Sequence, residues 1–525
     1  MRISVRLLAG AVLLVMALTG LRPYQSSLNS PAAVYNWLQY NGDPAHSGSN
    51  TSETLIGAAN VPSLAKLYQV TLPAVADGAP AYLSSVQTPV GLRSLLFLTT
   101  RPGHILAMDA LTGALVWSHQ VGPGSCRINN GSTPCYTTSS PAVDPSLAYV
   151  YSYGLDGRVH KYQVGDGTEV IDASWPELTT RKAFNEKGSP ALSIATATNG
   201  TSYLYMPNGG YPGDNGDYQG HVTAINLSTG AQQVFNAVCS NQTVHFVDIT
   251  AMPPTPDCPE VQTAIWSRAG VVYDARTDRI YMATGNGTFS PANHHWGDTV
   301  FAIHPDGSGS NGDPLDTFTP ASYQQLQNTD ADLGSTNLAL LPPQSGLFPN
   351  LGVQGGKDAL LRLINIDNFS GQGSIGHTGG EVGAPIAVPQ GGQVLSTPAV
   401  WSAPNGDTWI FVVTGSGISG LKLVVDGTGQ PSLSLGWKNT QGGFSPLVAN
   451  GVLYYAGSNL LHALNPLTGA SLWSSSLIGG IHWESPVVAN GVLYITDESA
   501  HLTAYSLGGI VPGATNSFFL PVIRR

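Results

Sequence analysis

One dipeptide, a Ser or Thr followed by Pro, recurs along the chain directly before an apolar stretch. Its six copies are Thr88-Pro89, Ser140-Pro141, Ser189-Pro190, Thr397-Pro398, Ser445-Pro446 and Ser485-Pro486. Within the first three and the last three copies, neighbouring prolines lie 40 to 52 residues apart. Periods of about 40–50 residues indicate the blades of a propeller or the units of a solenoid. The chain is therefore expected to repeat one small sheet many times.

Residues 446–473 show what one period contains. Apolar stretches at 452–455 and 460–464 are separated by a short polar turn, and a second turn precedes a last stretch that begins at residue 471. With the strand that opens at Pro446, this pattern predicts four antiparallel strands. No segment keeps a 3.6-residue apolar period, so alternating strands and helices are disfavoured. We predict an all-β protein.

The second turn of the period has its own signature. The pattern Ala-x-Asp/Asn-x-x-Thr-Gly-x-x-x-Trp spans residues 107–117 and 463–473, with a partial copy at 224–230 and a weaker one at 367–371. The Asp or Asn is expected to accept backbone N–H bonds within the turn, and the Gly to take a positive φ. The Trp is then available to cover the gap between adjacent sheets.

Composition supports this prediction and excludes one class of partner. Charged residues make up 10% of the chain, against about 25% in ordinary soluble proteins. The 62 glycines and 37 prolines suit short strands with frequent turns. The net charge is −11, and the chain has no run of Lys and Arg. A surface that neutralises phosphates is therefore not expected, and nucleic acid is not a predicted partner.

These motifs resemble those of the pyrroloquinoline quinone (PQQ) β-propellers, which include quinoprotein alcohol dehydrogenases and polyvinyl-alcohol-dehydrogenase-like proteins. The Trp-containing turn is similar to the tryptophan-docking motif of that family. The patterns Trp37-x-Gln39-Tyr40 and Asn60-Val61-x-x-Leu64-x-x-x-Tyr68 resemble its lead-in, with Tyr68 in place of the usual Trp. The resemblance covers roughly residues 37–507. It implies a β-propeller of four-stranded antiparallel blades.

Counting the blades predicts eight, with seven as the alternative because insertions blur the period between 263 and 371. The last blade lacks an outer strand before the chain leaves it. Residues 64–72 are expected to supply that strand, which would close the ring and remove its free edges. The expected domains are a signal peptide (1–25), an N-terminal arm (26–63), the propeller (64–509) and a C-terminal tail (510–525).

The two ends of the chain indicate where in the cell the protein is expected. Arg2 and Arg6 precede an apolar run at 7–21, a pattern typical of a secretory signal, with an uncleaved anchor as the alternative. The apolar segment 518–523 with its terminal arginines resembles retention tails of exported proteins, or is a frayed end. We expect a secreted, periplasmic or cell-surface protein that contacts membrane only through these ends.

Four cysteines fit an oxidising compartment, and they form two local pairs. Four cysteines allow three connectivities. We predict Cys126 with Cys135 and Cys239 with Cys258, because each pair would close one long loop. Free or metal-bound thiols are the alternative, but no CxxC spacing supports a metal site.

The resemblance implies PQQ and a calcium ion on the propeller axis, and particular residues match the parts that such a site needs. Asn286, in a Gly-Asn-Gly segment, resembles the amide ligand of the calcium ion, an oxygen donor suited to a hard cation. Trp266 resembles the Trp that stacks below the quinone. Lys357 resembles the cation beside the quinone oxygens, where it would stabilise the reduced cofactor. Arg268 and Trp483 are further expected cofactor contacts.

Asp330 is the first candidate for the catalytic base, with Asp332 as the second, because a carboxylate near calcium could take the alcohol proton. Asp330 and Asp214 are expected to complete the metal site, although no clear match exists for the family's Glu ligand. Each of these residues could instead be a turn or packing residue. The adjacent Cys-Cys pair of many quinoprotein alcohol dehydrogenases is absent, and no CxxCH haem motif exists.

Two functions remain open from the sequence. The first is an exported PQQ- and calcium-dependent dehydrogenase that oxidises an alcohol or sugar-like hydroxyl of a small molecule or polymer. Such an enzyme would need an external electron acceptor. The second is a non-catalytic propeller that acts as a surface or periplasmic binding scaffold, since a fold alone does not imply a function.

Overall fold

The computed structural model describes residues 34–121, 124–242, 258–371 and 375–513. The predicted signal peptide and the apolar segment at 518–523 lie outside these residues. The described chain is almost entirely strand and turn, with one short helix, α1 (Tyr323–Thr329). Its 3-10 turns are η1 (Val61–Ser63), η2 (Ile128–Asn130), η3 (Pro291–Asn293) and η4 (Leu333–Ser335). None of the helices in these ranges has the length and apolarity to span a membrane.

The strands form eight successive antiparallel sheets, which confirms the eight-bladed propeller and excludes the seven-bladed alternative. Blade 1 contains β3 (Ala81–Thr88), β4 (Gly91–Thr99), β5 (His104–Asp109) and β6 (Leu115–Gln120). Blade 2 contains β7 (Ala142–Val143), β8 (Tyr149–Tyr153), β9 (Arg158–Gln163) and β10 (Glu177–Leu178). Blade 3 contains β11 (Glu186–Lys187), β12 (Ser193–Thr196), β13 (Ser202–Gly210), β14 (His221–Asn226) and β15 (Gln232–Asn236).

The fourth and fifth blades carry the insertions that blur the sequence period. Blade 4 contains β16 (Val272–Asp274), β17 (Arg279–Ala283), β20 (Val300–Ile303) and β21 (Asp316–Phe318), with a small hairpin of β18 (Phe289–Ser290) and β19 (His295–Trp296). Blade 5 contains β22 (Ala339–Leu340), β23 (Leu351–Gln354), β24 (Leu360–Asn365) and β25 (Ile386–Ala387). Helix α1 and turn η4 lie between these two blades in the sequence.

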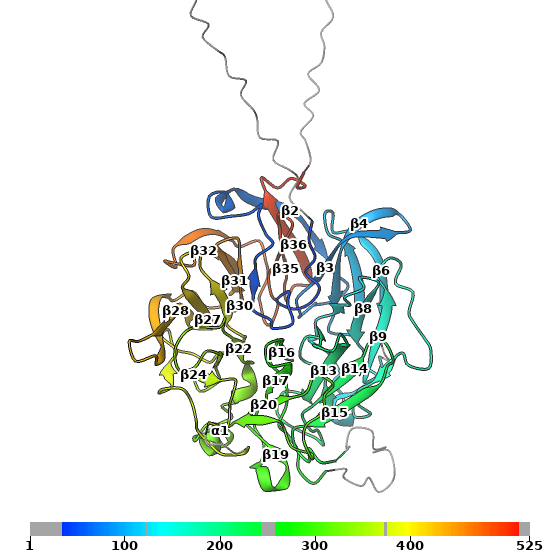
Figure 1. The fold of residues 1–525 in the computed structure, drawn as a ribbon. Coiled ribbons are helices and arrows are strands. Elements are labelled where there is room, and N and C mark those ends of the chain that lie inside the picture. The colour runs from blue at the N-terminus through cyan, green and yellow to red at the C-terminus, as the bar shows by residue number, and fades with distance from the viewer. Residues whose placement is uncertain (1–33, 122–123, 243–257, 372–374, 514–525) are drawn as a thin grey trace, which may run out of the picture. The chain divides into compact units, whose positions relative to one another are not determined.

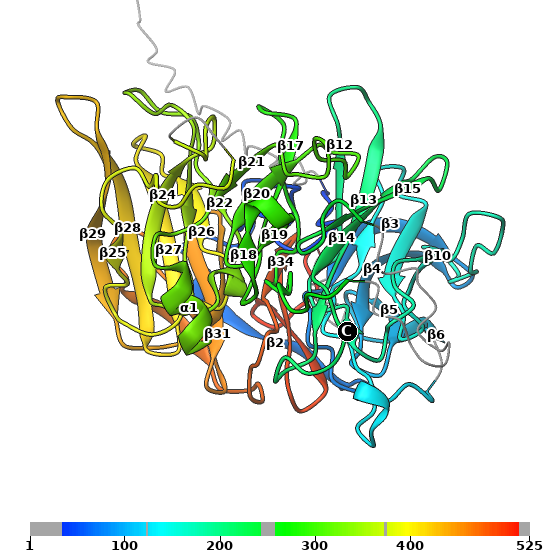
Figure 2. The ribbon, with the colours of Figure 1, turned by 90° about the horizontal axis from the view of Figure 1, so that it is seen from below.

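The remaining blades follow the regular pattern. Blade 6 contains β26 (Ala399–Ser402), β27 (Thr408–Thr414), β28 (Gly417–Val425) and β29 (Pro431–Asn439), which lie side by side in Figure 2. Blade 7 contains β30 (Phe444–Ala449), β31 (Val452–Gly457), β32 (Leu460–Leu464) and β33 (Ser471–Ser475), with β1 (Ser49–Asn50) parallel to β30. Blade 8 contains β34 (Val487–Ala489), β35 (Val492–Thr496) and β36 (His501–Leu507).

The outer strand of blade 8 comes from the other end of the sequence, as predicted. Strand β2 (Leu64–Thr71) pairs antiparallel with β36, from Leu64 opposite Leu507 to Thr71 opposite His501. Figure 1 shows the two strands, blue and red, next to each other. This pairing joins the first and last strands of the propeller and removes a free sheet edge.

The repeated turn has the predicted geometry. The carboxylate of Asp109 accepts the backbone N–H groups of Leu111 and Thr112, and Asn226 and Asn465 make the same pair of bonds in their own turns. Gly113, Gly230 and Gly469 have φ values of +70° to +72°. Only glycine adopts this backbone region without a steric cost.

The tryptophans of the two complete motifs, and Trp437 in the outer strand β29 of blade 6, bind the following blade. The indole N–H groups of Trp117, Trp437 and Trp473 donate to the backbone carbonyls of Val164, Pro466 and Leu64, respectively. A Cβ at Gly469 would lie 2.4 Å from the Trp437 ring, so the glycine of one turn makes room for the indole of the preceding blade. The motif therefore joins neighbouring blades through a hydrogen bond and a close ring contact.

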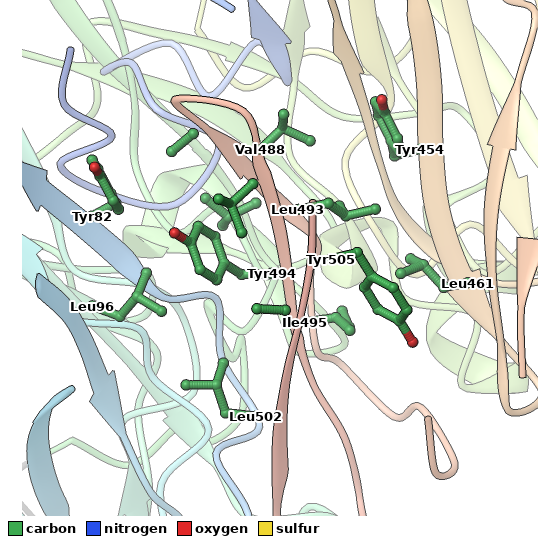
Figure 3. Packing of buried hydrophobic residues seen from close by; sticks show 14 of the residues in the cluster. Tyr82, Leu96, Tyr454, Leu461, Val488, Leu493, Tyr494, Ile495, Leu502 and Tyr505 are labelled. Atoms are coloured by element: carbon green, nitrogen blue, oxygen red, sulfur yellow. The ribbon is translucent and has the colours of Figure 1, made fainter. Parts of the chain in front are cut away.

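The apolar core lies within and between the blades. One cluster joins blades 7, 8 and 1 across the closure of the ring, and Figure 3 shows some of its side chains. Tyr494 of β35 and Tyr82 of β3 lie in this cluster with ring centres 6.2 Å apart. Both predicted disulfides, Cys126–Cys135 and Cys239–Cys258, are present. These contacts pack the blades against one another where the ring closes, and the disulfides close two loops.

Candidate functional site

A cavity of about 440 Å³ lies where the segments leading into the inner strands of five blades converge. Inner strands surround the axis of a propeller, so this convergence places the cavity at one end of the axis. Seven of the eight residues predicted from the sequence line it: Asp214, Trp266, Arg268, Asp330, Asp332, Lys357 and Trp483. The eighth, Asn286, lies in the connection between β17 and β18 and donates hydrogen bonds to Asp330 and Asp332.

Asn286, Asp330 and Asp332 form a hydrogen-bonded cluster at the cavity. The backbone N–H of Asn286 donates to Oδ1 of Asp332 at 2.7 Å, and its side-chain Nδ2 donates to Oδ1 of Asp330 at 2.9 Å. Asp330 takes the left-handed conformation that ends helix α1, and Asp332 directly precedes η4. The short helix and the 3-10 turn therefore set the direction of the two carboxylates.

The amide oxygen of Asn286 is buried and has no hydrogen-bond partner among the residues that the structure describes. Leaving a buried polar atom unpaired costs about 1–3 kcal/mol of folding free energy. A ligand that binds such an atom would remove this cost. The two N–H donors of Asn286 bond to two carboxylates, and an amide oxygen with carboxylate oxygens is a donor set suited to a hard cation such as calcium. The residues that are present fit a cation site.

Lys357 supplies the positive charge of the cluster. Its Nζ lies 2.5 Å from Oδ2 of Asp332 and 3.3 Å from Oδ1 of Asp330. Burial alone would lower the pKa of Lys357, but the two carboxylates outweigh it and raise that pKa. For Asp332 burial dominates and raises the pKa, while Lys357 opposes the change. The lysine is therefore a fixed cation at the cavity wall.

A further carboxyl group lies behind this cluster. Burial raises the pKa of Asp298 to about 8, against the opposing effect of the Leu333 N–H, which donates to its Oδ1 at 3.0 Å. The nearby charge of Asp332 raises that pKa further. Asp298 is therefore protonated at neutral pH and adds no negative charge to the cluster.

Two indole rings form the aromatic part of the cavity wall. The rings of Trp266 and Trp483 meet edge to face with their centres 6.1 Å apart. Each ring carries a cation: Nζ of Lys357 is 5.3 Å from the Trp266 ring centre, and the Arg268 guanidinium is 5.4 Å from that of Trp483. Such contacts fix the orientation of both partners. A planar ligand could stack on these rings within reach of both cations.

Gly285 leaves the space in which these parts meet. A Cβ at this position would lie 2.5 Å from Oδ1 of Asp332 and 3.1 Å from the indole nitrogen of Trp266. Real Cβ atoms essentially never come as close as the first of these distances. The glycine before Asn286 thus permits the carboxylate and the indole to approach the same point.

Asp214 reaches the cavity but has a different partner from the one predicted. Its Oδ1 accepts the hydroxyl of Tyr218 at 2.6 Å, and it adopts a left-handed backbone conformation with φ of 51°. The structure therefore brings Asp214 to the cavity without placing it in the contacts that join Asn286, Asp330 and Asp332. Its role as a metal ligand stays a prediction.

Several charged residues of the cavity region were not selected from the sequence. Lys187 lines the cavity, and Asp77, Arg101 and Glu498 form an ion-paired cluster at its edge. Glu484 is buried beside them, and burial raises its pKa to about 9. A sequence signal existed: Glu484 directly precedes a Ser-Pro copy, and Lys187 lies two residues before another. Because charged residues make up only 10% of the chain, a charged residue directly before an inner strand indicates a position near the propeller axis.

Comparison with known proteins agrees with the fold. The PQQ_2 family model, described as outer membrane protein assembly factor BamB, matches residues 57–311 and 391–510, more than half of the chain. The chain belongs to this family. It is a PQQ-type β-propeller protein, as its repeats predicted.

Two relatives with described functions are each 25% identical to part of this PQQ-type propeller. The dehydrogenase subunit of a quinone-dependent alcohol dehydrogenase from Komagataeibacter europaeus is 25% identical over 294 residues, which are 50% of this chain and 38% of that protein. The chain thus matches less than half of the length of this relative. Another such subunit, from Gluconobacter oxydans, is 25% identical over 318 residues, which are 54% of this chain and 40% of that protein.

The quinohemoprotein alcohol dehydrogenase ADHIIG of Pseudomonas putida HK5 is similar in structure, with a TM-score of 0.60 at 15% identity over 93% of this chain and 82% of the other. At this identity, the structural likeness concerns the fold alone.

Proposed function

We propose that this protein is a PQQ- and cation-dependent dehydrogenase that oxidises the hydroxyl group of an alcohol or sugar-like substrate. The observation that carries the proposal is the amide oxygen of Asn286, which is buried and unpaired within the described residues, on a side chain that bonds to Asp330 and lies next to Asp332. It supports a cation there, for which calcium is the first choice. The similarity to quinone-dependent alcohol dehydrogenase subunits supports the same reaction class.

The residues of this chain would bind the cation and the cofactor as follows. Asn286, Asp330 and Asp332 would hold the cation, and Trp266 with Trp483 would hold the flat face of PQQ. When bound, PQQ supplies a two-electron acceptor for the hydride of the alcohol. Asp214 is a further proposed ligand of the cation.

Asp330 is the proposed base for the hydroxyl proton, with Asp332 as the alternative. The Asp330 carboxylate is 68% exposed, which leaves it open to a substrate, whereas the Asp332 carboxylate is 8% exposed and paired with Lys357. Lys357 would stabilise negative charge that develops beside it in the transition state. Arg268, over Trp483, is a further proposed cofactor contact.

The test is uptake of PQQ by the purified protein with calcium, followed by dye reduction in the presence of simple alcohols, sugars or polyvinyl alcohol. We expect PQQ to remain with the protein through gel filtration and the dye to be reduced. Asp330→Asn should abolish reduction even when PQQ and calcium are saturating, because it removes the base. Asp332→Asn should weaken PQQ and calcium uptake together, because it breaks the contact to Lys357. Asp166→Asn, at an exposed turn, is the matched control.

Absence of PQQ uptake at any calcium concentration would contradict the proposal. That result would favour the second candidate, a non-catalytic propeller that binds another macromolecule, which the description of the matched family model supports. Under either candidate we propose export to a periplasmic, surface or secreted location. The two disulfides are consistent with an oxidising compartment. An external electron acceptor is proposed for the enzyme.

A further inference from the structure

Two insertions border the axial cavity, and a second hollow of about 370 Å³ lies between them. The β18–β19 hairpin follows β17 through Gly285 and Asn286, and helix α1 ends at Asp330, which lines the axial cavity. Both insertions therefore lie at the end of the propeller where the candidate base is exposed. Binding residues are often carried by such connections, because the rigid strands beneath them set their position.

The hollow is lined by aromatic, amide and hydroxyl side chains. Besides Gly287, the described residues that line it are Thr288, Phe289, Tyr323, Gln324, Gln327 and Asn328, and none of these is charged. The rings of Phe289 and Tyr323 meet edge to face with their centres 4.8 Å apart, and both residues are half-buried. The two rings therefore keep apolar surface that a ligand in the hollow could contact.

Helix α1 supplies four of these side chains from one side. Tyr323 and Gln327 are four residues apart, as are Gln324 and Asn328, so the members of each pair are neighbours on successive turns. Oε1 of Gln327 also accepts the backbone N–H of Gly287, which joins the helix to the connection that leads into the hairpin. The hollow is therefore a defined surface that two bonded elements share.

These side chains match the chemistry of a neutral sugar. The C–H groups on one side of a sugar ring are apolar and can pack on an aromatic ring, which buries the apolar surface of both. An amide side chain offers both donors and acceptors, and so can bond to hydroxyl groups in either role. The Glu260 carboxylate is already bonded to the Thr288 hydroxyl at 2.7 Å. The described lining therefore favours a neutral, polyhydroxylated ligand over an ion.

We propose that this hollow binds one ring of a neutral oligosaccharide while another ring presents its hydroxyl to Asp330. Along helix α1, the path from Tyr323 to Asp330 is about 10 Å long, which is longer than one sugar ring. A chain of sugars can thus reach the hollow and the candidate base together, whereas a single sugar cannot. The inference rests on the proposed function for the reacting hydroxyl, and it narrows the substrate to an oligosaccharide.

The test measures sugar binding to the intact protein without PQQ, by isothermal titration calorimetry with glucose, maltohexaose, cellohexaose and polyvinyl alcohol. Gln324→Ala and Gln325→Ala form a matched pair, because both residues are exposed on α1 and only Gln324 lines the hollow. Alanine favours a helix, so both variants should keep α1. We expect wild type and Gln325→Ala to bind a hexasaccharide more tightly than glucose, and Gln324→Ala to bind it about threefold more weakly through a lost hydrogen bond.

The aromatic contact is tested with two variants of Tyr323. Tyr323→Ala should weaken hexasaccharide binding about tenfold, because it removes the apolar ring surface. Tyr323→Phe keeps the ring and should bind within about twofold of wild type, which separates loss of the ring from loss of the fold. In PQQ-loaded protein, Tyr323→Ala should raise the KM for the hexasaccharide and leave the KM for glucose unchanged, because the hollow contributes binding away from the reacting hydroxyl.

The outcomes separate this inference from the proposed function. If Tyr323→Ala and Gln324→Ala bind the hexasaccharides as wild type does, or if wild type prefers no hexasaccharide to glucose, the sugar site is refuted. Tyr323-dependent binding of polyvinyl alcohol alone would also overturn it. Tyr323-dependent hexasaccharide binding by a protein that takes up no PQQ would support the sugar site and contradict the dehydrogenase. Dye reduction with simple alcohols and no preference for a hexasaccharide would refute the sugar site and leave the dehydrogenase proposal intact.

Discussion

A single methyl group at Gly285 should disable the proposed cation site while leaving the propeller folded. In Gly285→Ala, the new Cβ would lie 2.5 Å from Oδ1 of Asp332, about 1 Å inside an ordinary contact. Asp332 must then move, because the backbone of the β17–β18 connection is held by its own hydrogen bonds. The movement would break the 2.7 Å bond from the Asn286 N–H and disturb the pairing with Lys357.

The size of the effect follows from the bond that is lost. A hydrogen bond to a charged group contributes about 1.5–3 kcal/mol, which corresponds to roughly 10- to 150-fold in a binding constant. The assay is terbium binding, followed by luminescence sensitised through the adjacent indole of Trp266. Terbium replaces calcium at oxygen sites, so the assay does not depend on PQQ. We expect terbium affinity to fall by about that factor.

The control is Gly427→Ala, because a Cβ at Gly427 meets no atom within 4 Å. This variant should bind terbium as wild type does. Both variants should melt within a few degrees of wild type, because neither position belongs to an apolar core cluster of the described residues. A Gly285→Ala protein that binds terbium within twofold of wild type would refute the argument that Asp332 and Asn286 form the cation site. Failure of wild type to bind terbium would refute the site itself.

Two further predictions concern the propeller. Trp437→Phe should lower the free energy of unfolding by about 1 kcal/mol in urea titrations, because it loses the indole bond to the Pro466 carbonyl, 2.7 Å long, that joins blades 6 and 7. Burial lowers the pKa of His462 from 6.5 to about 4, and its ring stacks on Tyr455. Wild type should therefore lose up to about 3 kcal/mol as the pH falls from 6.5 through 4. In His462→Phe this loss should be smaller by that amount; an identical acid dependence would contradict it.

Most of the fold could be predicted from the sequence because its signals are local. The Asp-x-x-Thr-Gly turn specifies its own hydrogen bonds and its own positive φ within five residues, as the turn at Asp109 shows. Because the last blade lacks an outer strand of its own, the N-terminal segment that forms β2 was expected to supply it. The same reasoning was less accurate in blade 5, where the outer strand β25 lies at Ile386–Ala387, well after the weak turn signal at 367–371.

The site could be predicted only as far as motifs resemble those of a family. Asp330, Asp332, Lys357 and Trp266 were selected in this way, and the structure brings their side chains together. Their roles stay predictions until ligands are tested. Lys187 belongs to no such motif, and its importance depends on what surrounds it. Whether a lysine is buried depends on residues that are far away in the sequence. The position of Lys187 in the sequence was therefore only a weak signal.

The sequence by itself therefore predicted the repeating four-stranded sheet, eight blades with seven as the alternative, the closing strand and the cysteine pairs. These features depend on short-range turn chemistry and on a period that can be counted. Only the tertiary structure decided that Asn286 donates hydrogen bonds to two carboxylates, that Asp214 binds Tyr218, and that Lys187 and Arg268 line one cavity. The physical reason is that burial and electrostatic pairing at the axis arise where loops from different blades converge, and no single segment of the chain contains them.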